Sequence, residues 1–372
     1  MSKLSKICHL TSVHKRYDTR IFVKECCSLA KNNLYAVTLI VADGLGDEIT
    51  HNVTILDAEV RKGGRLTRFT HTVLSIYAKA LIADADLYHL HDPELIPIGL
   101  KLKRLGKKVV FDAHEDFPKQ ILSKPYLSKP TKLILSRVSE AYERYACRKL
   151  DAIVAATPFI RDKFVQINPH TVDINNFPIL GELTNDTPWD EKRNEVCYIG
   201  GIAKIRGIIE IVEAMSHTDN ARLSLAGSFE SDQTRIYALH TPGWDKVNEL
   251  GFLDRAGVAD LLRYSKAGLV TLHPTQNYID ALPVKMFEYM AAGIPVIASD
   301  FPLWRSILES NCCGLLVDPL NPLDITKAID YLIAYPKEAQ MMGKNGQQAV
   351  RELYNWQREE EKLITLYKEL LP

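Results

Sequence analysis

Short apolar runs alternate with longer amphipathic stretches from one end of the chain to the other. The apolar runs are rich in Val, Ile and Leu, as expected for strands that helices bury on both faces of a sheet. The pattern therefore predicts an α/β protein with parallel sheets. The expected strands are Lys6–Leu10, Ala36–Val41, Val53–Leu56, Leu87–Leu90, Lys108–Phe111 and Ala152–Ala155 in the first half, and Val196–Ile199, Leu223–Ala226, Lys246–Leu250, Gly268–Leu272, Pro295–Ser299 and Leu315–Val317 in the second.

The alternation lapses between Asn175 and Asn194, where turn-forming residues replace the periodic pattern. A length of 372 residues suits two domains that each bury a core. We therefore expect two Rossmann-like domains facing a central cleft. Apolar residues at helical spacing near the end of the chain predict an amphipathic helix that returns to the first domain. The expected divisions are a first domain of residues 1–178, a linker of 179–195, a second domain of 196–354 and a terminal helix of 355–372.

The composition narrows the class of partner and the compartment. The 46 basic and 46 acidic residues cancel, so no global positive field favours nucleic acid as a partner. The seven cysteines include two adjacent pairs and no CxxC spacing, which is typical of a reducing compartment. The start lacks a signal-peptide pattern, and no run approaches the roughly 18 apolar residues that span a bilayer. These features predict a cytoplasmic protein whose membrane contact, if any, is peripheral.

A glycine turn opens the second half of the chain. Gly200 and Gly201 follow the expected strand Val196–Ile199 and precede an apolar helical pattern. A strand, a glycine turn and a helix present backbone N–H groups at the carboxyl edge of a sheet, where phosphate binds. Lys204 and Arg206 add positive charge there. A tight turn whose basic residues face water fits the same pattern equally well.

Two acidic residues, Asp280 and Glu288, mark a second candidate binding segment in this half of the chain. Asp280 follows an expected strand that ends near His273, and Glu288 lies early in a short helix that begins at Pro283. Carboxylates at the carboxyl edge of a sheet suit the hydroxyls of a sugar and a ribose, and Lys285 could face a phosphate. A glutamate in an early helical turn can also act on the helix dipole alone.

This segment resembles the E-x7-E signature of the retaining GT-B glycosyltransferases of family 4, the group 1 glycosyltransferases. The wording E-G-L-P-x4-E-A-M-A-x-G-x-P-V matches residues 280–296, with Asp280 in place of the first glutamate and Ala281 in place of the glycine. The resemblance implies that Glu288 binds the nucleotide ribose and that Asp280 lies by the donor sugar or its leaving phosphate. It also implies that Arg206, where the family usually has Lys, steadies the departing diphosphate. The implied donor site comprises Gly200, Gly201, Lys204, Arg206, His273, Asp280, Ala281, Leu282, Pro283, Lys285 and Glu288.

Histidines gather where two strands of the first domain end. His89 and His91 end one expected strand, and His114 follows another. The resemblance implies that His114 is the donor-site histidine, catalytic together with Asp280 and Arg206. Loop capping by these side chains is an alternative, and a metal site is another. We expect no metal here, although the possible ligands are His89, His91, Asp92, His114, Glu115 and Asp116.

The acceptor side is expected in the polar loop after the first strand. His14, Arg16 and Asp18, with His91, could bind acceptor hydroxyls or a lipid diphosphate, and a loop of solvated charges is equally consistent. The stretch from Lys119 to Leu150 mixes apolar and basic residues. Such a surface could rest on anionic lipid, or it could be an ordinary helix with solvated lysines.

The resemblance implies a hexosyltransferase that moves a sugar from a UDP- or GDP-linked donor to a saccharide or lipid-linked saccharide, with retention of configuration, in surface polysaccharide assembly. No cofactor beyond this substrate is expected. An epimerase or phosphorylase on the same scaffold and a non-catalytic nucleotide-sugar-binding protein are alternatives. A dinucleotide oxidoreductase is disfavoured, because the one G-x-G pattern, at Gly44 and Gly46, is not followed by an apolar helix.

Overall fold

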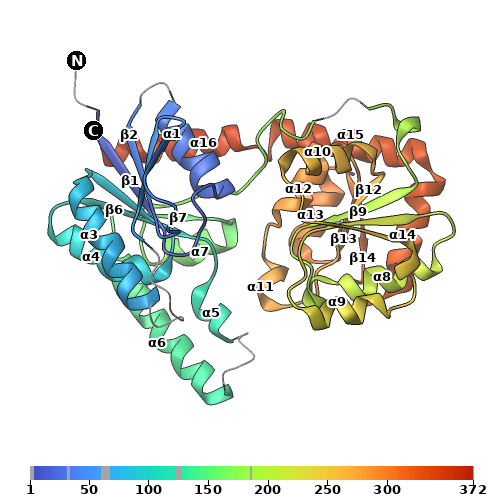
Figure 1. Ribbon diagram of the computed structural model, residues 1–372, viewed down its shortest axis with the longest axis horizontal. Coiled ribbons are helices and arrows are strands. Elements are labelled where there is room, and N and C mark those ends of the chain that lie inside the picture. Colours follow the sequence, from blue (N-terminus) through green and yellow to red (C-terminus); the bar gives the residue numbers. More distant parts are fainter. Residues whose placement is uncertain (1–3, 32–33, 60–67, 123–127, 185–186, 372) are drawn as a thin grey trace. The chain divides into compact units, whose positions relative to one another are not determined.

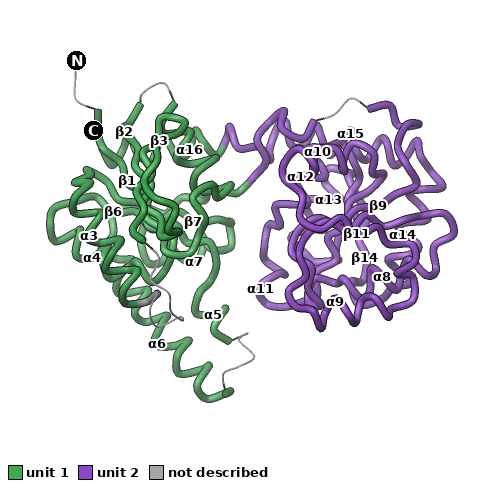
Figure 2. Tube along the Cα trace, in the orientation of Figure 1, with its two compact units in different colours: residues 1–176, 359–372 green, residues 177–358 purple. Residues whose placement is uncertain are grey.

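The computed structural model describes residues 4–31, 34–59, 68–122, 128–184 and 187–371. Two compact units make up the chain (Figure 2): unit 1 is Met1–Asn176 with Glu359–Pro372, and unit 2 is Phe177–Arg358. Residues 179–195, expected as a linker, are therefore counted within unit 2, and residues 185 and 186 of that segment lie outside the described residues. The second border between the units falls inside helix α16, Trp356–Leu370.

Unit 1 contains a sheet with the strand order β3-β4-β2-β1-β5-β6-β7-β8. Its pairings are parallel except for β3 with β4. The short strands β3 and β8 were not expected from the sequence. The strands are β1 (Lys6–Leu10), β2 (Ala36–Val41), β3 (Glu48–Thr50), β4 (Val53–Asp57), β5 (Leu87–Leu90), β6 (Lys108–Ala113), β7 (Ala152–Ala155) and β8 (Thr171–Asp173).

The two faces of this sheet differ in character. Because side chains alternate along a strand, Cys8 and Tyr88 point into an apolar core that includes residues of α3 and α4, whereas His9 and His89 occupy the opposite face. Figure 1 shows α3 and α4 beside this sheet. Tyr367 of α16 lies on that opposite face, so the terminal helix returns to unit 1 as expected. The helices of unit 1 are η1 (Thr19–Cys26), α1 (Cys27–Ala30), η3 (Arg68–Thr72), α3 (Val73–Ala83), η4 (Pro93–Leu95), α4 (Ile96–Arg104), α5 (Phe117–Leu122), α6 (Lys129–Cys147), α7 (Pro158–Val165) and the end of α16.

Unit 2 contains a parallel sheet with the strand order β11-β10-β9-β12-β13-β14. The α/β class with two parallel-sheet domains, expected from the pattern of apolar runs, is confirmed. The strands are β9 (Glu195–Ile199), β10 (Arg222–Ala226), β11 (Val247–Gly251), β12 (Ala267–Val270), β13 (Val296–Ser299) and β14 (Gly314–Val317).

Helices bury both faces of the sheet of unit 2. Apolar residues of α8 and α14 pack on one face, and those of α10, α12, α13 and α15 pack on the other. Among the helices that the structure describes, none combines the length and the apolar character needed to span a bilayer. The helices are η5 (Trp189–Glu191), η6 (Lys204–Arg206), α8 (Ile208–His217), α9 (Asp232–Leu239), η7 (Trp244–Lys246), α10 (Arg255–Tyr264), α11 (Gln276–Ile279), α12 (Val284–Ala291), α13 (Pro302–Ser310), α14 (Pro322–Ala334) and α15 (Pro336–Glu352).

Candidate functional site

The loops after β9, β10 and β12 meet at the carboxyl edge of the sheet of unit 2. The amide of Gly200 donates to the Ala226 carbonyl at 2.9 Å, and the amide of His273 donates to the Ile205 carbonyl at 3.0 Å. A Cβ on Gly227, whose φ is +143°, would lie 1.9 Å from the Gly200 carbonyl oxygen. Glycine is therefore required for this close approach of two loops, and the turn expected at Gly200 and Gly201 is held firmly by its neighbours.

Two cations face this glycine turn. The Lys285 ammonium is buried, lies 3.7 Å from the centre of the Tyr198 ring, and has no hydrogen-bond partner among the described residues. A Cβ on Gly200 would lie 3.5 Å from that ammonium, and one on Gly201 would lie 3.3 Å from Nη1 of Arg206. Burial, with the nearby Arg206 charge, lowers the pKa of Lys285 to about 7. Such unpaired positive charge at the strand ends is suited to a phosphate.

Arg206 remains positively charged beside the glycine turn. Burial opposes the charged form, but the hydroxyls of Tyr198 and Tyr278 raise the pKa of Arg206 above its ordinary value. Tyr278 belongs to α11, directly before Asp280, so the glycine turn and the acidic loop approach each other here. Among the described residues, none forms a hydrogen bond or an ion pair with the half-buried Asp280 carboxylate.

Glu288 is buried and already paired. Its Oε1 accepts a 2.6 Å hydrogen bond from Nη1 of Arg255, whose Nε donates to Glu182 at 2.7 Å. Arg255 begins α10, after the strand β11, and its role was not predicted from the sequence. Arg255 is held by Glu182, and its second hydrogen bond orients the Glu288 carboxylate at the strand ends.

A mostly apolar pocket of about 250 Å³ lies beside the glycine turn. Its walls come from the ends of β9, β10 and β11 and from the start of α10. The lining residues are Ile199, Gly200, Gly201, Ala226, Gly227, Ser228, Phe252, Leu253 and Val258. A flat, weakly polar group such as a nucleobase suits such a pocket, with phosphates towards Lys285 and Arg206.

Other residues of the predicted donor site have structural contacts. The Lys204 ammonium lies 4.3 Å from the centre of the Tyr237 ring, so it points to α9 and does not join Lys285. His273 Nε2 is 3.1 Å from a Glu210 carboxylate oxygen in the first turn of α8. The remaining residues shape the start of α12: Pro283 is its N-cap, Leu282 packs against the core, and the Ala281 carbonyl accepts from the indole of Trp304 at 2.7 Å.

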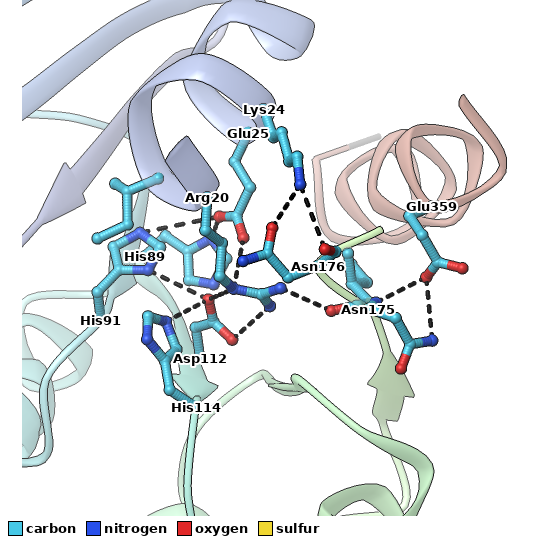
Figure 3. A network of polar contacts seen from close by, with 12 residues as sticks. Arg20, Lys24, Glu25, His89, His91, Asp112, His114, Asn175, Asn176 and Glu359 are labelled. Carbon is cyan, nitrogen blue, oxygen red and sulfur yellow. Dashed lines mark hydrogen bonds and ion pairs between the residues drawn. The ribbon is translucent and has the colours of Figure 1, made fainter. Parts of the chain in front are cut away.

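In unit 1, His114 is held by a buried carboxylate (Figure 3). Its Nε2 is 2.8 Å from Oδ2 of Asp112, and Asp112 also receives two hydrogen bonds of 2.8 Å from the Arg20 guanidinium. Burial opposes the charge of Asp112, but Arg20 and the neighbouring histidines hold its pKa well below the ordinary value. His114 is one-fifth exposed and can therefore reach a ligand, whereas Asp112 and Arg20 are buried.

The acceptor residues predicted in unit 1 have different surroundings. His14 is half-buried between Asp18, at 3.3 Å, and Asp92, at 3.6 Å, and these contacts raise its pKa. Asp18 also caps η1 by accepting from two backbone amides. The ring of His14 lies 5.2 Å from that of His114, so these two residues do share one site. His91 is buried, unlike an exposed residue that could bind an acceptor, and its Nδ1 forms a 3.2 Å hydrogen bond with Asp112.

The Arg16 side chain is hydrogen-bonded to the segment that follows β2. Its guanidinium donates to Asp43, Glu48 and the Gly46 carbonyl. The amides of Gly44 and Gly46 donate to the Asp57 carboxylate at 3.2 and 2.9 Å. The G-x-G pattern therefore encloses a carboxylate of the protein, which leaves no place for a dinucleotide phosphate, and Arg16 stabilises this loop.

The metal ligands considered from the sequence do not converge as one set. Asp92 accepts from Thr11 and Ser12, and Asp116 pairs with Lys163 at 2.9 Å. Within the described part of the chain, His89 and His91 instead come together with the buried residues His9 and Glu25, and His91 and His114 come together at Asp112. Neither His9 nor Glu25 was singled out by the sequence patterns, because each lies in an otherwise ordinary strand or helix.

Two family models match the chain. The Glycosyltransferase Family 4 model matches residues 21–174, and the Glycosyl transferases group 1 model matches residues 181–349. Among curated relatives, the chain is 24% identical over 292 residues to the D-rhamnosyltransferase WbpZ of Pseudomonas aeruginosa. This alignment covers 74% of this chain and 71% of the relative. It is 22% identical over 275 residues to the alpha-D-kanosaminyltransferase of Streptomyces kanamyceticus, an alignment that covers 68% of this chain and 70% of the relative. The chain belongs to the group 1 glycosyltransferases.

Solved structures show the same fold. Sucrose-phosphate synthase from Thermosynechococcus elongatus has a TM-score of 0.78 at 19% identity, covering 98% of this chain and 99% of that one. HepE of Anabaena in complex with UDP-glucose has a TM-score of 0.74 at 15% identity, with the same coverage. These likenesses establish the GT-B fold, in agreement with the two parallel-sheet units.

Proposed function

We propose that the protein transfers a hexosyl group from a nucleotide diphosphate sugar to a saccharide or lipid-linked saccharide, with retention of anomeric configuration. The observation that carries this proposal is the buried, unpartnered Lys285 ammonium beside the Gly200 turn and Arg206. Family membership and the relatives that act as sugar transferases support it. The nucleobase would occupy the pocket at Phe252, Glu288 would bind the ribose, and the two cations would hold the diphosphate.

The chemistry follows from where charge develops. As the bond between the donor sugar and the diphosphate breaks, negative charge grows on the leaving diphosphate, and Lys285 and Arg206 offset it. Asp280, which has no hydrogen-bond or ion-pair partner among the described residues, would bind hydroxyls of the donor sugar. His114 of unit 1, fixed by Asp112, would contact the donor sugar. The acceptor hydroxyl would attack from the face that the diphosphate leaves, and its proton would pass to the departing diphosphate.

The proposal is tested by incubating the protein with UDP-, GDP- and ADP-linked hexoses and measuring released nucleoside diphosphate. Release with one nucleotide class, abolished in Lys285→Met, supports it. A control variant is Lys204→Met, whose ammonium lies over Tyr237 and should affect release little. The anomeric configuration of the product, read from its proton NMR coupling, decides retention against inversion. Absence of release with every donor, in the presence of mixed saccharide acceptors, would contradict the proposal.

We further propose that helix α6 rests on an anionic membrane and thereby supports a lipid-linked acceptor in surface polysaccharide assembly. Ile134, Val138, Tyr142 and Tyr145 recur every three or four residues and so share one face. Ile134 is 62% exposed and Val138 is 60% exposed. Exposed apolar residues in such a row are unusual for a surface helix. Of the basic stretch expected from the sequence, residues 123–127, including Lys124, lie outside the described residues.

The charges of α6 favour an anionic lipid surface. Arg137 and Arg144, both exposed, are seven residues apart and share a neighbouring face of the helix. Cosedimentation with phosphatidylcholine vesicles, with and without 30% phosphatidylglycerol, tests the proposal. Binding should require phosphatidylglycerol and should be lost in the double variant Ile134→Asn, Val138→Asn. Leu323→Asn, which replaces an equally exposed leucine of unit 2, is the control. Binding that is unchanged in the α6 variant, or absent from wild type, would overturn it.

A further inference from the structure

Four ionisable side chains meet in the interior of unit 1. His9 of β1 pairs with His89 of β5 in the sheet, and His91 lies two residues further along the same face. Glu25 of η1 packs over them, as Figure 3 shows for Glu25, His89 and His91. His91 is 2% exposed and the other three are fully buried. This buried histidine group, His9, Glu25, His89 and His91, has no part in the donor chemistry proposed above.

The candidate ligand atoms of the group all lie within 4.8 Å of one another. Oε2 of Glu25 is 3.8 Å from Nδ1 of His9, 3.7 Å from Nδ1 of His89 and 3.8 Å from Nε2 of His91. The Nδ1 of His9 is 2.9 Å from the Nε2 of His91. Tetrahedral zinc with bonds of about 2.0–2.1 Å sets its ligand atoms roughly 3.3 Å apart, which lies within this range.

The described residues only partly balance the charge of a Glu25 carboxylate. Neither of its carboxylate oxygens has a hydrogen-bond partner among the described residues. Arg20 lies 3.2 Å from Oε1, but its hydrogen bonds are directed to Asp112 and to the Ile174 carbonyl. Two buried carboxylates, Glu25 and Asp112, thus share one guanidinium. A further cation, either a proton or a metal ion, would offset the remaining negative charge.

The outer hydrogen bond of one histidine is that of a metal ligand. The second ring nitrogen of His91, Nδ1, is 3.2 Å from Asp112. Metal-binding histidines generally donate their other N–H to a carboxylate or a similar acceptor.

We propose that His9, Glu25, His89 and His91 form a closed, structural binding site for Zn²⁺. Three imidazole nitrogens and one carboxylate oxygen are ligands that zinc prefers, and complete burial leaves no open position for a substrate. The ion would tie β1, β5 and η1 together beneath Asp112, which positions His114. The Tyr367 hydroxyl is 2.8 Å from Nδ1 of His89, the atom that faces Glu25, so Tyr367 competes with the ion for His89.

The direct test is the zinc content of untagged protein that has been expressed with added zinc and then passed over a chelating resin. We expect about one equivalent per chain, and replacement with Co²⁺ should give the intense visible absorption of a tetrahedral site. His170→Gln, which alters an exposed histidine, should keep the ion. Glu25→Gln and His9→Gln should lose it while far-ultraviolet circular dichroism confirms that they fold.

A second variant separates a metal site from a hydrogen-bonded network. Tyr367→Phe removes the competing hydroxyl and frees Nδ1 of His89, so it should hold zinc at least as tightly as wild type in a chelator competition. Loss of zinc in Tyr367→Phe would overturn the assignment of His89 as a ligand. Wild-type protein that takes up neither zinc nor cobalt would overturn the whole proposal and would leave a proton as the balancing cation.

Discussion

The Lys285 ammonium lies 3.7 Å from the centre of the Tyr198 ring and is buried, and no residue in the described part of the chain accepts a hydrogen bond from it. The aromatic face attracts the charge but compensates for the lost hydration only in part. The result is a lysine whose pKa falls from 10.5 to about 7, chiefly through burial. An anionic ligand beside this ammonium would restore the charge, which links nucleotide binding to proton uptake.

At pH 8 the binding of a nucleoside diphosphate should therefore take up about one proton. Lys285 is mostly neutral in the free protein at this pH, and the diphosphate raises its pKa. Isothermal titration calorimetry in two buffers with different ionisation enthalpies measures the uptake, which should vanish in Lys285→Met. Equal heats in both buffers for the wild-type protein would show that Lys285 does not meet the diphosphate.

The same lysine makes stability depend on pH. Its pKa is lower in the folded state than in the unfolded state, so the unfolded chain binds more protons between about pH 7 and 10.5. This group alone should make the free energy of unfolding rise with pH across that window, and its penalty is fully present below pH 7. The melting temperature of Lys285→Met relative to wild type should therefore be higher at pH 7 than at pH 10. A difference that is independent of pH would contradict this.

Arg255 should affect nucleotide affinity through Glu288. Replacement by Met removes the 2.6 Å hydrogen bond that orients the Glu288 carboxylate. We expect the dissociation constant of the preferred nucleoside diphosphate to rise roughly tenfold, the effect of one charge-assisted hydrogen bond. Arg263→Met is a matched control on the same helix, because Arg263 donates to Thr187 instead. Equal losses of affinity in the two variants would indicate a general disturbance of α10.

Gly207 should be intolerant of any side chain. Its φ is +76°, and a Cβ would lie 2.0 Å from the Thr271 carbonyl oxygen. Gly207→Ala should lower the stability of unit 2 by about 3 kcal/mol or more, from steric overlap and backbone strain together. Gly181 has a φ of +86° with no atom near its Cβ position, so Gly181→Ala should cost only about 1–2 kcal/mol. Urea denaturation of both variants measures the difference, and similar losses would contradict the steric argument.

His114 should act in transfer and not in nucleotide binding. Replacement by Asn should slow the release of nucleoside diphosphate from the donor roughly 100-fold, the lower range for loss of one positioned hydrogen-bonding group at the reacting centre. The affinity for the nucleoside diphosphate itself should remain unchanged, because the proposed nucleotide contacts lie in unit 2. His170→Asn is the control. A parallel loss of affinity and rate in His114→Asn would count against this division of roles.

The strands were largely predictable because helices bury them on both faces, so each appears as an apolar run. Strands β3 and β8 have three residues each and carry too little pattern to be recognised. The glycine turn and the segment from Asp280 to Glu288 were found from local spacing. Arg255 was missed because its partner Glu288 is 33 residues away, and nothing local marks such a pair.

In unit 1, too, polar residues are paired with partners that are distant in the sequence and could not be predicted from local patterns. Arg16 was expected to bind an acceptor, but its partners Asp43 and Glu48 come from another loop. His9 and Glu25 were overlooked because a single histidine in a strand or glutamate in a helix is common. Only the pairing of β1 with β5 brings His9 beside His89, and only the packing of η1 against the sheet adds Glu25.

The central claim is that unit 2 binds a nucleoside diphosphate between the Gly200 turn and Glu288. Its most direct test is the thermal stability of the purified protein in the presence of UDP, GDP, ADP, CMP or NAD, since a ligand of the native state alone raises the melting temperature. We predict a shift with one nucleoside diphosphate, reduced in Glu288→Gln and in Lys285→Met. A shift with NAD alone, or with none of these ligands at millimolar concentration, would contradict the account.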